Sequence, residues 1–418
     1  MEVFSQNEFI LNGTGKIIYD HLEVEAHFQI EYSSLKLILK TSKVKMGQLF
    51  AINKGKFKGV IEKSNIEIQC SKICLTQYTK YQLSFVLLDD LIIGCELNSK
   101  IFKATLFGLN ISIKEFRVEN YLIQLNLLED FELLNSYTKK FGSNLETGQI
   151  IIKKSDDLTL DKTETIETCN NICLLTSLIS ARNIVYNRCL FIDKNQDTQE
   201  HIRIKLNSFS FGYKFVYEDD LSSILPKLYE SFKNLNPIEQ KSIHTSISYL
   251  NSSSSQFLED SILNVSQIWE ILSDTFVKEE INNSENINTL RSELKIQIRK
   301  WHKENTVKDY DLSFIMNRVL GSLDWEKVIK KMETLVESEN IDSEKVGLSF
   351  KDLIELRNQI AHSGRFKQIG NEDEYLEIYN SSLLGIKVLL LNKLGYSGRI
   401  TYFVGGIPHT ESINYYLK

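Results

Sequence analysis

The stretch Ser349–Gly364, SFKDLIELRNQIAHSG, predicts one short helix with defined ends. Ser349 followed three residues later by Asp352 resembles a capping box, in which side-chain oxygens accept hydrogen bonds from the first free N–H groups of a helix. Gly364 suits the left-handed conformation that ends many helices. Apolar residues recur at steps of three and four and form one stripe for burial, at Leu353, Leu356 and Ile360.

The polar residues of this helix suit attack on a phosphodiester. Asn358 and His362 nearly overlie one another on a helix, and Arg357 lies on their flank. A histidine passes a proton to or from a ribose oxygen near neutral pH, and an arginine offsets the charge that builds on a phosphoryl oxygen. This chemistry needs no metal or other cofactor. The structural alternative is an arginine paired with a carboxylate and a histidine that interacts with the helix dipole, so the surrounding sequence has to decide.

Composition predicts a soluble protein of two or three domains. The chain has 418 residues, of which 42% are hydrophobic and 25% charged, and its net charge is −6. Any contact with RNA must therefore come from a local basic patch. The sequence has no apolar run long enough to span a membrane and no secretory leader, and its six cysteines are sparse. We expect a cytoplasmic protein.

Two cysteine pairs share a C-x3-C spacing, Cys70 with Cys74 and Cys169 with Cys173. A shared metal site is one interpretation of this repeat. The neighbouring residues are apolar, which favours buried thiols, and we expect no metal.

Residues 1–218 predict a β-rich domain, with antiparallel strands in a sandwich or an open barrel. Alternating or β-branched runs suggest strands, and Asn12-Gly13 and Lys54-Gly55 suggest turns. Four of these runs are Leu22–Ile30, Leu35–Leu39, Asn65–Gln69 and Ile111–Lys114. A short helix is expected near residues 172–184. This half has no phosphate-binding glycine loop, no G-x-S-x-G and no H-E-x-x-H motif.

Residues 219–418 predict an all-α domain. An apolar stripe along residues 258–276 must be buried against other helices. A further helix, near residues 288–304, has a basic flank whose Arg299, Lys300 and Lys303 are candidates for RNA binding, and the structural alternative is a solvated face. Separate helices are expected around residues 312–323 and 325–335, and a last helix from about Glu372 to Leu394.

The order of these features resembles the HEPN superfamily. Arg357-Asn-Gln-Ile-Ala-His362 matches its R-x4-H signature, in which a polar residue such as Asn358 usually follows the arginine. The motif lies near the end of a penultimate helix, and one long apolar helix follows. With a β-rich domain in front, the whole chain resembles the ApeA-like anti-phage HEPN proteins of bacteria. The resemblance is specific over Leu356–Gly364, supportive over residues 219–395 and architectural over the front half.

This resemblance implies an endoribonuclease that needs no metal ion and works at a site shared by the two HEPN domains of a homodimer. His362 would move the proton of the ribose 2′-hydroxyl or of the leaving oxygen. Arg357 would offset charge on the phosphorus, and Asn358 would orient the imidazole or a phosphate oxygen. Arg365, just beyond the helix, would hold a neighbouring phosphate.

The resemblance also implies a role in abortive infection, with tRNA or another structured RNA as the substrate. The β-rich domain would then restrain the nuclease until a phage-derived activator binds. Two other functions stay open. One is a non-catalytic HEPN protein that binds RNA or a nucleotide through its basic face, and the other is a sensor whose β-rich domain acts while the helices only dimerise.

Overall fold

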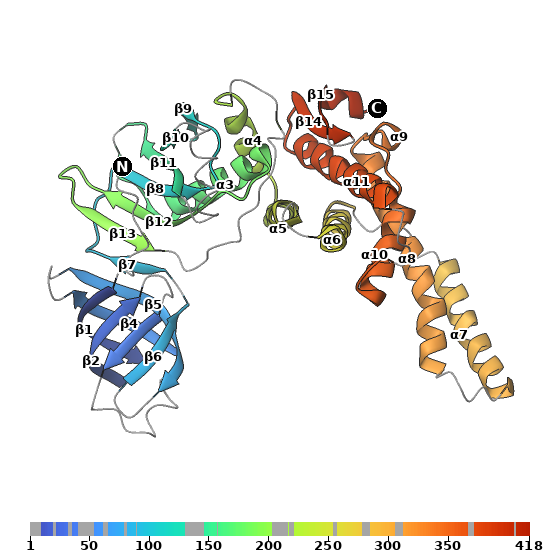
Figure 1. Cartoon of the computed structure of the whole chain (residues 1–418), viewed down its shortest axis with the longest axis horizontal. Coiled ribbons are helices and arrows are strands. Elements are labelled where there is room, and N and C mark those ends of the chain that lie inside the picture. Colours follow the sequence, from blue (N-terminus) through green and yellow to red (C-terminus); the bar gives the residue numbers. More distant parts are fainter. Residues whose placement is uncertain are drawn as a thin grey trace. The chain divides into compact units, whose positions relative to one another are not determined.

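The computed structural model describes residues 10–19, 22–31, 36–40, 54–61, 66–78, 82–88, 90–129, 146–156, 158–202, 216, 221–253, 257–277, 285–305, 312–366, 372–404 and 407–418. The chain divides into two compact units (Figure 1). One comprises Met1–Cys173 with Ile184–Ser208, and the other comprises Leu174–Asn183 with Phe209–Lys418. The predicted boundary at residues 218 and 219 lies outside the described residues.

Six strands of the β-rich unit close into a barrel. They are β1 (Ile10–Tyr19), β2 (Leu22–Glu31), β3 (Lys36–Lys40), β4 (Lys54–Ile61), β5 (Glu67–Tyr78) and β6 (Gln82–Leu87). Neighbours are antiparallel in the order β4-β1-β2-β3-β6-β5, and the ring closes because β4 also pairs with β5. The antiparallel β structure is confirmed. Of the two predicted architectures the sheet is barrel-like, and the barrel is closed rather than open, because β4 has a partner along both edges.

Aromatic side chains fill the barrel. Phe28 and Phe57 are buried, and their rings meet edge to face with centroids 5.1 Å apart. A Cβ atom at Gly13 would lie 2.6 Å from the Phe28 ring, so the backbone of β1 passes directly over it. The turns predicted at Asn12-Gly13 and Lys54-Gly55 are therefore wrong, since both pairs lie inside strands.

The sheet continues beyond the barrel from β5. It runs through β7 (Leu91–Ile93), β13 (Thr198–Ile202), β12 (Val185–Ile192), β8 (Ile101–Phe107), β11 (Glu146–Lys154), β10 (Tyr121–Leu127) and β9 (Ile113–Val118). The first part of α3 (Lys162–Ser180) packs on these strands (Figure 1). Tyr121 and Tyr186 of the sheet donate hydrogen bonds to Glu164 and Asn170 of α3, at 3.1 and 3.0 Å.

Helix α3 starts earlier than the sequence predicts. The sequence predicts a short helix near residues 172–184, but α3 begins at Lys162 and ends at Ser180. Asp161 accounts for the early start, because its Oδ1 accepts a hydrogen bond from the Glu164 N–H at 2.9 Å and so acts as an N-cap.

The second unit is built on helices. They are α4 (Ile224–Lys233), α5 (Pro237–Ser253), α6 (Leu258–Phe276), α7 (Glu285–Asn305), α8 (Leu312–Ser338), α9 (Ser343–Val346), α10 (Phe350–Ser363) and α11 (Glu372–Lys393). The predicted apolar stripe of α6 is confirmed, with Ile262, Val265 and Trp269 fully buried. The two helices expected between residues 312 and 335 are one continuous helix, α8. The motif helix α10 packs against α6, α8 and α11.

The sequence predicts an all-α domain here, and this prediction is wrong, because the unit also contains strands. Strands β14 (Arg399–Val404) and β15 (Ile407–Ser412) form an antiparallel hairpin, and the 3₁₀ helix η1 (Ile413–Tyr416) follows. The end of the chain then returns to the α8–α9 connection, where Lys418 N–H donates to the Asn340 carbonyl at 2.7 Å. Arg399–Val404 is rich in β-branched and aromatic residues, which is a local signal for a strand. Within the described part of the chain, no helix combines the length and apolar character needed to cross a bilayer.

Lys387 of α11 is only 5% exposed, and its burial lowers the pKa of the ammonium group from 10.5 to about 7. Between these two pH values the unfolded chain holds a proton that the folded chain lacks, so stability rises with pH across the window. At lower pH both states are protonated, and the cost of burying the charge is fully present. We expect Lys387→Met to raise the melting temperature of the helical unit by several degrees at about pH 6, and by less at about pH 9.5.

The matched control is Lys351→Met, because Lys351 is exposed on α10. It should give no such pH-dependent difference. An equal gain for Lys387→Met at both pH values would contradict the assignment.

Candidate active site

The helix α10 begins and ends where the sequence predicts. Ser349 is the N-cap, and its Oγ accepts a hydrogen bond from the Asp352 N–H at 3.4 Å. Gly364 ends the helix with φ +69°, and its N–H donates to the Ile360 carbonyl at 2.7 Å. Each end of the motif helix therefore has a cap within the chain, and the caps fix where the helix begins and ends.

Burial along α10 separates its apolar stripe from its polar face. Leu353, Leu356 and Ile360 are buried, as predicted. Arg357 and Asn358 are half-buried, and residues 361–365, at and just beyond the end of the helix, are all exposed. The polar face of the motif therefore runs from a partly buried guanidinium to an exposed imidazole.

Arg357 is held by two oxygen atoms. Its Nη2 lies 3.2 Å from Oε1 of Glu270 on α6, and its Nη1 donates to the Asn358 Oδ1 at 3.4 Å. The side chains of Arg357 and Glu270 are each 26% exposed. The Glu270 Oε1 is buried, and among the described residues it has no hydrogen bond, so its ion pair with the guanidinium offsets the cost of its desolvation.

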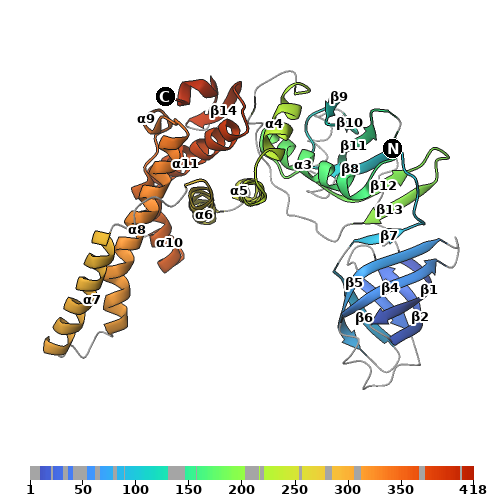
Figure 2. The same ribbon diagram turned by 180° about the vertical axis from the view of Figure 1, so that it is seen from behind.

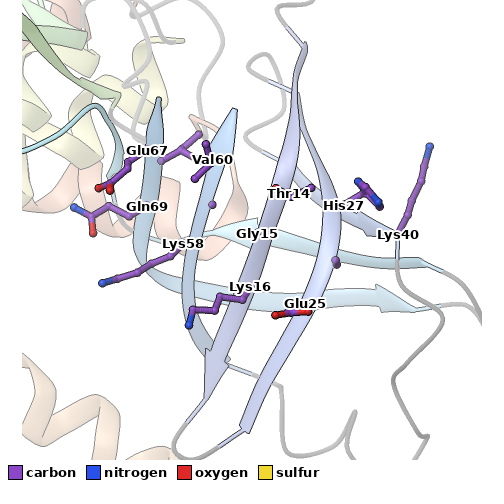
Figure 3. A pocket seen from close by; sticks show the side chains of 13 residues that line it. Thr14, Gly15, Lys16, Glu25, His27, Lys40, Lys58, Val60, Glu67 and Gln69 are labelled. Carbon is purple, nitrogen blue, oxygen red and sulfur yellow. The ribbon is translucent and has the colours of Figure 1, made fainter. Parts of the chain in front are cut away.

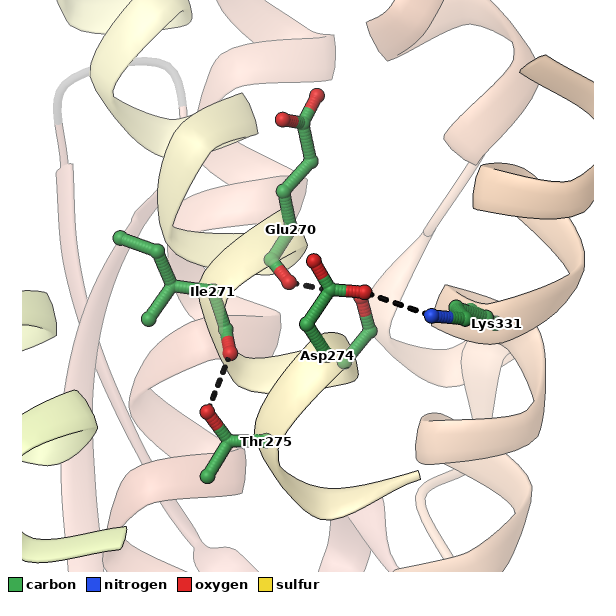
Figure 4. A network of polar contacts seen from close by, with 6 residues as sticks. Glu270, Ile271, Asp274, Thr275 and Lys331 are labelled. Carbon is green, nitrogen blue, oxygen red and sulfur yellow. Dashed lines mark hydrogen bonds and ion pairs between the residues drawn. The ribbon is translucent and has the colours of Figure 1, made fainter. Parts of the chain in front are cut away.

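Glu270 is a site residue that the sequence alone does not reveal. The only local signal is that a carboxylate directly follows the buried Trp269, in the otherwise uncharged stretch of α6 between Asp260 and Asp274. Figure 4 shows the Glu270 carboxylate pointing away from a second α6 carboxylate, Asp274, which accepts a hydrogen bond from Lys331 of α8 at 2.8 Å. Asp274 and Glu270 therefore have different partners. One ties α6 to α8, and the other holds the arginine of the motif.

His362 lies one turn beyond Asn358 at the exposed end of α10. In the described part of the chain, no residue bonds to its imidazole, so both ring nitrogens are open to a ligand. Ala361 and Ser363 beside it are small and exposed, and the Ser363 Oγ donates back to the Gln359 carbonyl at 2.6 Å. Arg365 is also exposed at this end of the helix. The motif thus presents an accessible imidazole beside a positioned guanidinium.

The structure places the predicted RNA-binding residues in two locations. Arg365 adjoins the motif, whereas Arg299, Lys300 and Lys303 are exposed on α7, which packs on α8 rather than on α10. Figures 1 and 2 show α7 beside the first half of α8 from both sides. Within one chain the basic helix is therefore not part of the motif's immediate surroundings.

Helix α7 leaves much of its apolar side exposed. Leu290 is 44% exposed and Trp301 is 49% exposed. Leu294 and Ile298 are half-buried. An exposed tryptophan beside Lys300 and Lys303 offers the combination of ring surface and cations that single-stranded nucleic acids bind.

The two C-x3-C pairs lie on different elements of secondary structure, and three of their four thiols are buried. Cys70, Cys169 and Cys173 are buried, and Cys74 is half-buried. The first pair lies on β5 and the second on α3. Among the described residues, no group of three or more His, Cys, Asp and Glu side chains is arranged to hold a metal ion.

Comparison of the chain with models of known protein families, with curated proteins and with solved structures finds no match.

Proposed function

We propose that the chain is an HEPN-type endoribonuclease that acts without a metal ion, as a homodimer, in bacterial anti-phage defence. The observation that carries the proposal is the geometry of α10. An exposed imidazole at His362 lies one turn from Asn358, which itself contacts a half-buried arginine held by Glu270. These are the groups that proton transfer and charge stabilisation at a phosphodiester require.

In the proposed reaction, one His362 takes the proton of a ribose 2′-hydroxyl. The 2′-oxygen attacks the phosphorus, and the bond to the 5′-oxygen breaks. The leaving oxygen receives a proton from the symmetry-related His362, and Arg357 offsets the charge on the phosphoryl oxygens. The products are a 2′,3′-cyclic phosphate and a 5′-hydroxyl. DNA, which lacks the attacking oxygen, should not be cleaved.

A dimer supplies the second proton-transfer group. An isologous interface duplicates every contact about its two-fold axis, so placing α10 at the axis brings two copies of His362 to one site. The small, exposed side chains of Ala361 and Ser363 allow another helix to approach closely there. Both tRNA and other folded RNAs would be read in their unpaired loops, where bases are accessible.

The proposal is tested by incubating the purified protein with total RNA in a chelating buffer and mapping the fragment ends. Cleavage at discrete unpaired positions is expected. Binding without cleavage would instead identify a non-catalytic HEPN protein. Fragments that form only when a divalent cation is restored would exclude the metal-independent mechanism.

The basic helix α7 provides a separate prediction for RNA affinity. Arg299, Lys300 and Lys303 are exposed, and removing each cation that pairs with a phosphate should lower the slope of log affinity against log salt by about one. We expect the triple replacement by glutamine to weaken RNA binding in a salt-titrated filter assay while cleavage at saturating RNA continues. Unchanged affinity and salt dependence would mean that α7 is a solvated helix with no part in binding.

Glu270 is expected to act as a positioning residue for Arg357. The Glu270→Gln variant keeps the shape of the side chain but loses the ion pair at 3.2 Å, so the guanidinium should lose its fixed orientation. We expect kcat to fall about tenfold with little change in KM, since the pair orients a group that acts in the transition state. Asp274→Asn is the matched control, because it removes the other α6 ion pair. Equal losses in both variants would indicate a general effect on α6 instead.

A further inference from the structure

A groove of about 770 Å³ crosses the outer face of the β-barrel. Five neighbouring strands, β3, β2, β1, β4 and β5, contribute to it (Figure 3). The polar side chains that line it alternate along the strands with buried ones such as Ile17, Phe28 and Phe57, which fill the barrel. The groove therefore belongs to the solvent-facing side of the sheet.

Strand register arranges the lining residues in rows across the strands. In one row Glu25 pairs with Lys16, Lys16 pairs with Lys58, and Lys58 pairs with Gln69. A parallel row runs from Lys40 through His27 to Glu67 at the far side. Figure 3 shows these side chains on the same face of the strands. Three lysines and two glutamates thus share one groove.

The centre of the groove concentrates positive charge. Lys16 and Lys58 are direct cross-strand partners, a position in which like charges destabilise a sheet. On its other side Lys16 has the carboxylate of Glu25 as its cross-strand partner, which offsets its charge. On its other side Lys58 has only the neutral Gln69 as its cross-strand partner. An anion bound between the two lysines would remove this repulsion.

Two glycines recess the floor between the rows. Gly15 and Gly59 are cross-strand partners, directly beside the lysine pair. A Cβ at Gly59 would lie 2.7 Å from the Phe28 ring, and one at Gly15 would lie 2.7 Å from the Lys58 carbonyl oxygen. The backbone of β1 and β4 therefore lies directly against the aromatic side chains inside the barrel, closer than any residue with a Cβ would allow. As a result, the outer surface of the sheet is recessed at these two glycines.

We propose that this groove binds a nucleotide, with a phosphate between Lys16 and Lys58 and with Glu25 or Glu67 accepting hydrogen bonds from ribose hydroxyls or base amino groups. A volume of about 770 Å³ matches small-molecule sites. The carboxylates of Glu25 and Glu67 would repel the continuous phosphate backbone of a long nucleic acid. They would also repel the carboxylates of an acidic peptide. The inference concerns the β-rich unit and goes beyond the RNA cleavage proposed for α10.

The test is isothermal titration calorimetry of the full chain with AMP, ADP, ATP and the dinucleotide pApA, with inorganic phosphate as a separate arm. Binding of at least one nucleotide is expected, and inorganic phosphate alone should bind more weakly. Lys58→Gln should weaken nucleotide binding about tenfold, because one charge-assisted hydrogen bond is removed. Lys153→Gln is the control, since Lys153 is an exposed lysine of β11, outside the groove.

A separate readout distinguishes recognition of the sugar and base from recognition of phosphate. Glu25→Gln and Glu67→Gln should weaken nucleotide binding while leaving the binding of inorganic phosphate unchanged. The proposal is overturned if no nucleotide binds at about 1 mM. It is also overturned if Lys58→Gln binds as well as the unaltered chain, if phosphate binds as tightly as nucleotides, or if a polyglutamate peptide outcompetes them. Because affinity is read directly, the result does not depend on whether the chain cleaves RNA.

Discussion

Replacing His362 by alanine is expected to reduce RNA cleavage by about 10²- to 10⁴-fold, which is the contribution of one general acid–base group. The fold should survive, because His362 is exposed at the end of α10 and the described residues make no hydrogen bond to its ring. Exposed positions of this kind change stability by about 0.5 kcal/mol or less. Initial cleavage rates on an end-labelled RNA, measured beside a thermal melt of the same sample, give both quantities.

The matched control is His409→Ala. His409 is also exposed but lies on β15 and stacks on Tyr402. The His409→Ala variant should cleave RNA at the rate of the unaltered protein. If His362→Ala retained full activity with a normal melting curve, the imidazole would have no part in the chemistry, and the motif would be structural.

The second large effect is expected at Trp269, which is fully buried beneath the site. Its ring meets Phe350 of α10 edge to face at 4.9 Å, and a Cβ at Gly385 of α11 would lie 2.9 Å from it. The indole therefore fills the space where α6, α10 and α11 meet. Trp269→Ala should destabilise the helical unit by about 3–5 kcal/mol, because apolar burial is reduced and a cavity is left behind. Urea unfolding of the full chain, followed by circular dichroism, measures this destabilisation.

Trp269→Phe is the control for this prediction. It keeps most of the ring, and among the described residues the indole N–H has no hydrogen-bond acceptor, so little polar interaction is removed. We expect about a third of the destabilisation caused by alanine. Equal destabilisation by the two replacements would contradict the packing role of the ring.

The elements that the sequence predicts well have strong local signals. The limits of α10 follow from the cap at Ser349 and the left-handed Gly364, both of which act within one turn of the helix end. The stripe of α6 follows from helical spacing alone. In both cases the information lies within a few residues, which is the range over which periodicity and capping operate.

The elements that the sequence mispredicts depend on distant partners. Gly13 resembles a turn residue in isolation, and only its neighbours on the adjacent strands, the Val60 carbonyl and the Phe28 ring, explain a glycine within β1. Closure of the barrel likewise depends on the pairing of β4 with β5, which no local pattern reveals. The hairpin β14–β15 is an exception, because its first strand has a local signal in the sequence although it follows a long run of helices.

The candidate site shows the same division. Arg357, Asn358 and His362 share one face because they share one helix, so their proximity follows from spacing. Glu270 reaches Arg357 only through the packing of α6 on α10, which is a tertiary contact. The separation of α7 from α10 is tertiary as well, and it removes Arg299, Lys300 and Lys303 from the surroundings of the motif within one chain.

The most direct test of the proposed chemistry changes one atom of the substrate. An RNA that the protein cleaves at a mapped position is resynthesised with a single 2′-deoxynucleotide on the 5′ side of that bond, and its cleavage is compared with that of the unaltered RNA in a chelating buffer. If the 2′-oxygen is the nucleophile, the deoxy substrate stays intact at that position, and the unaltered RNA yields a 2′,3′-cyclic phosphate end. Cleavage of both substrates at the same rate would contradict the mechanism assigned to Arg357, Asn358 and His362.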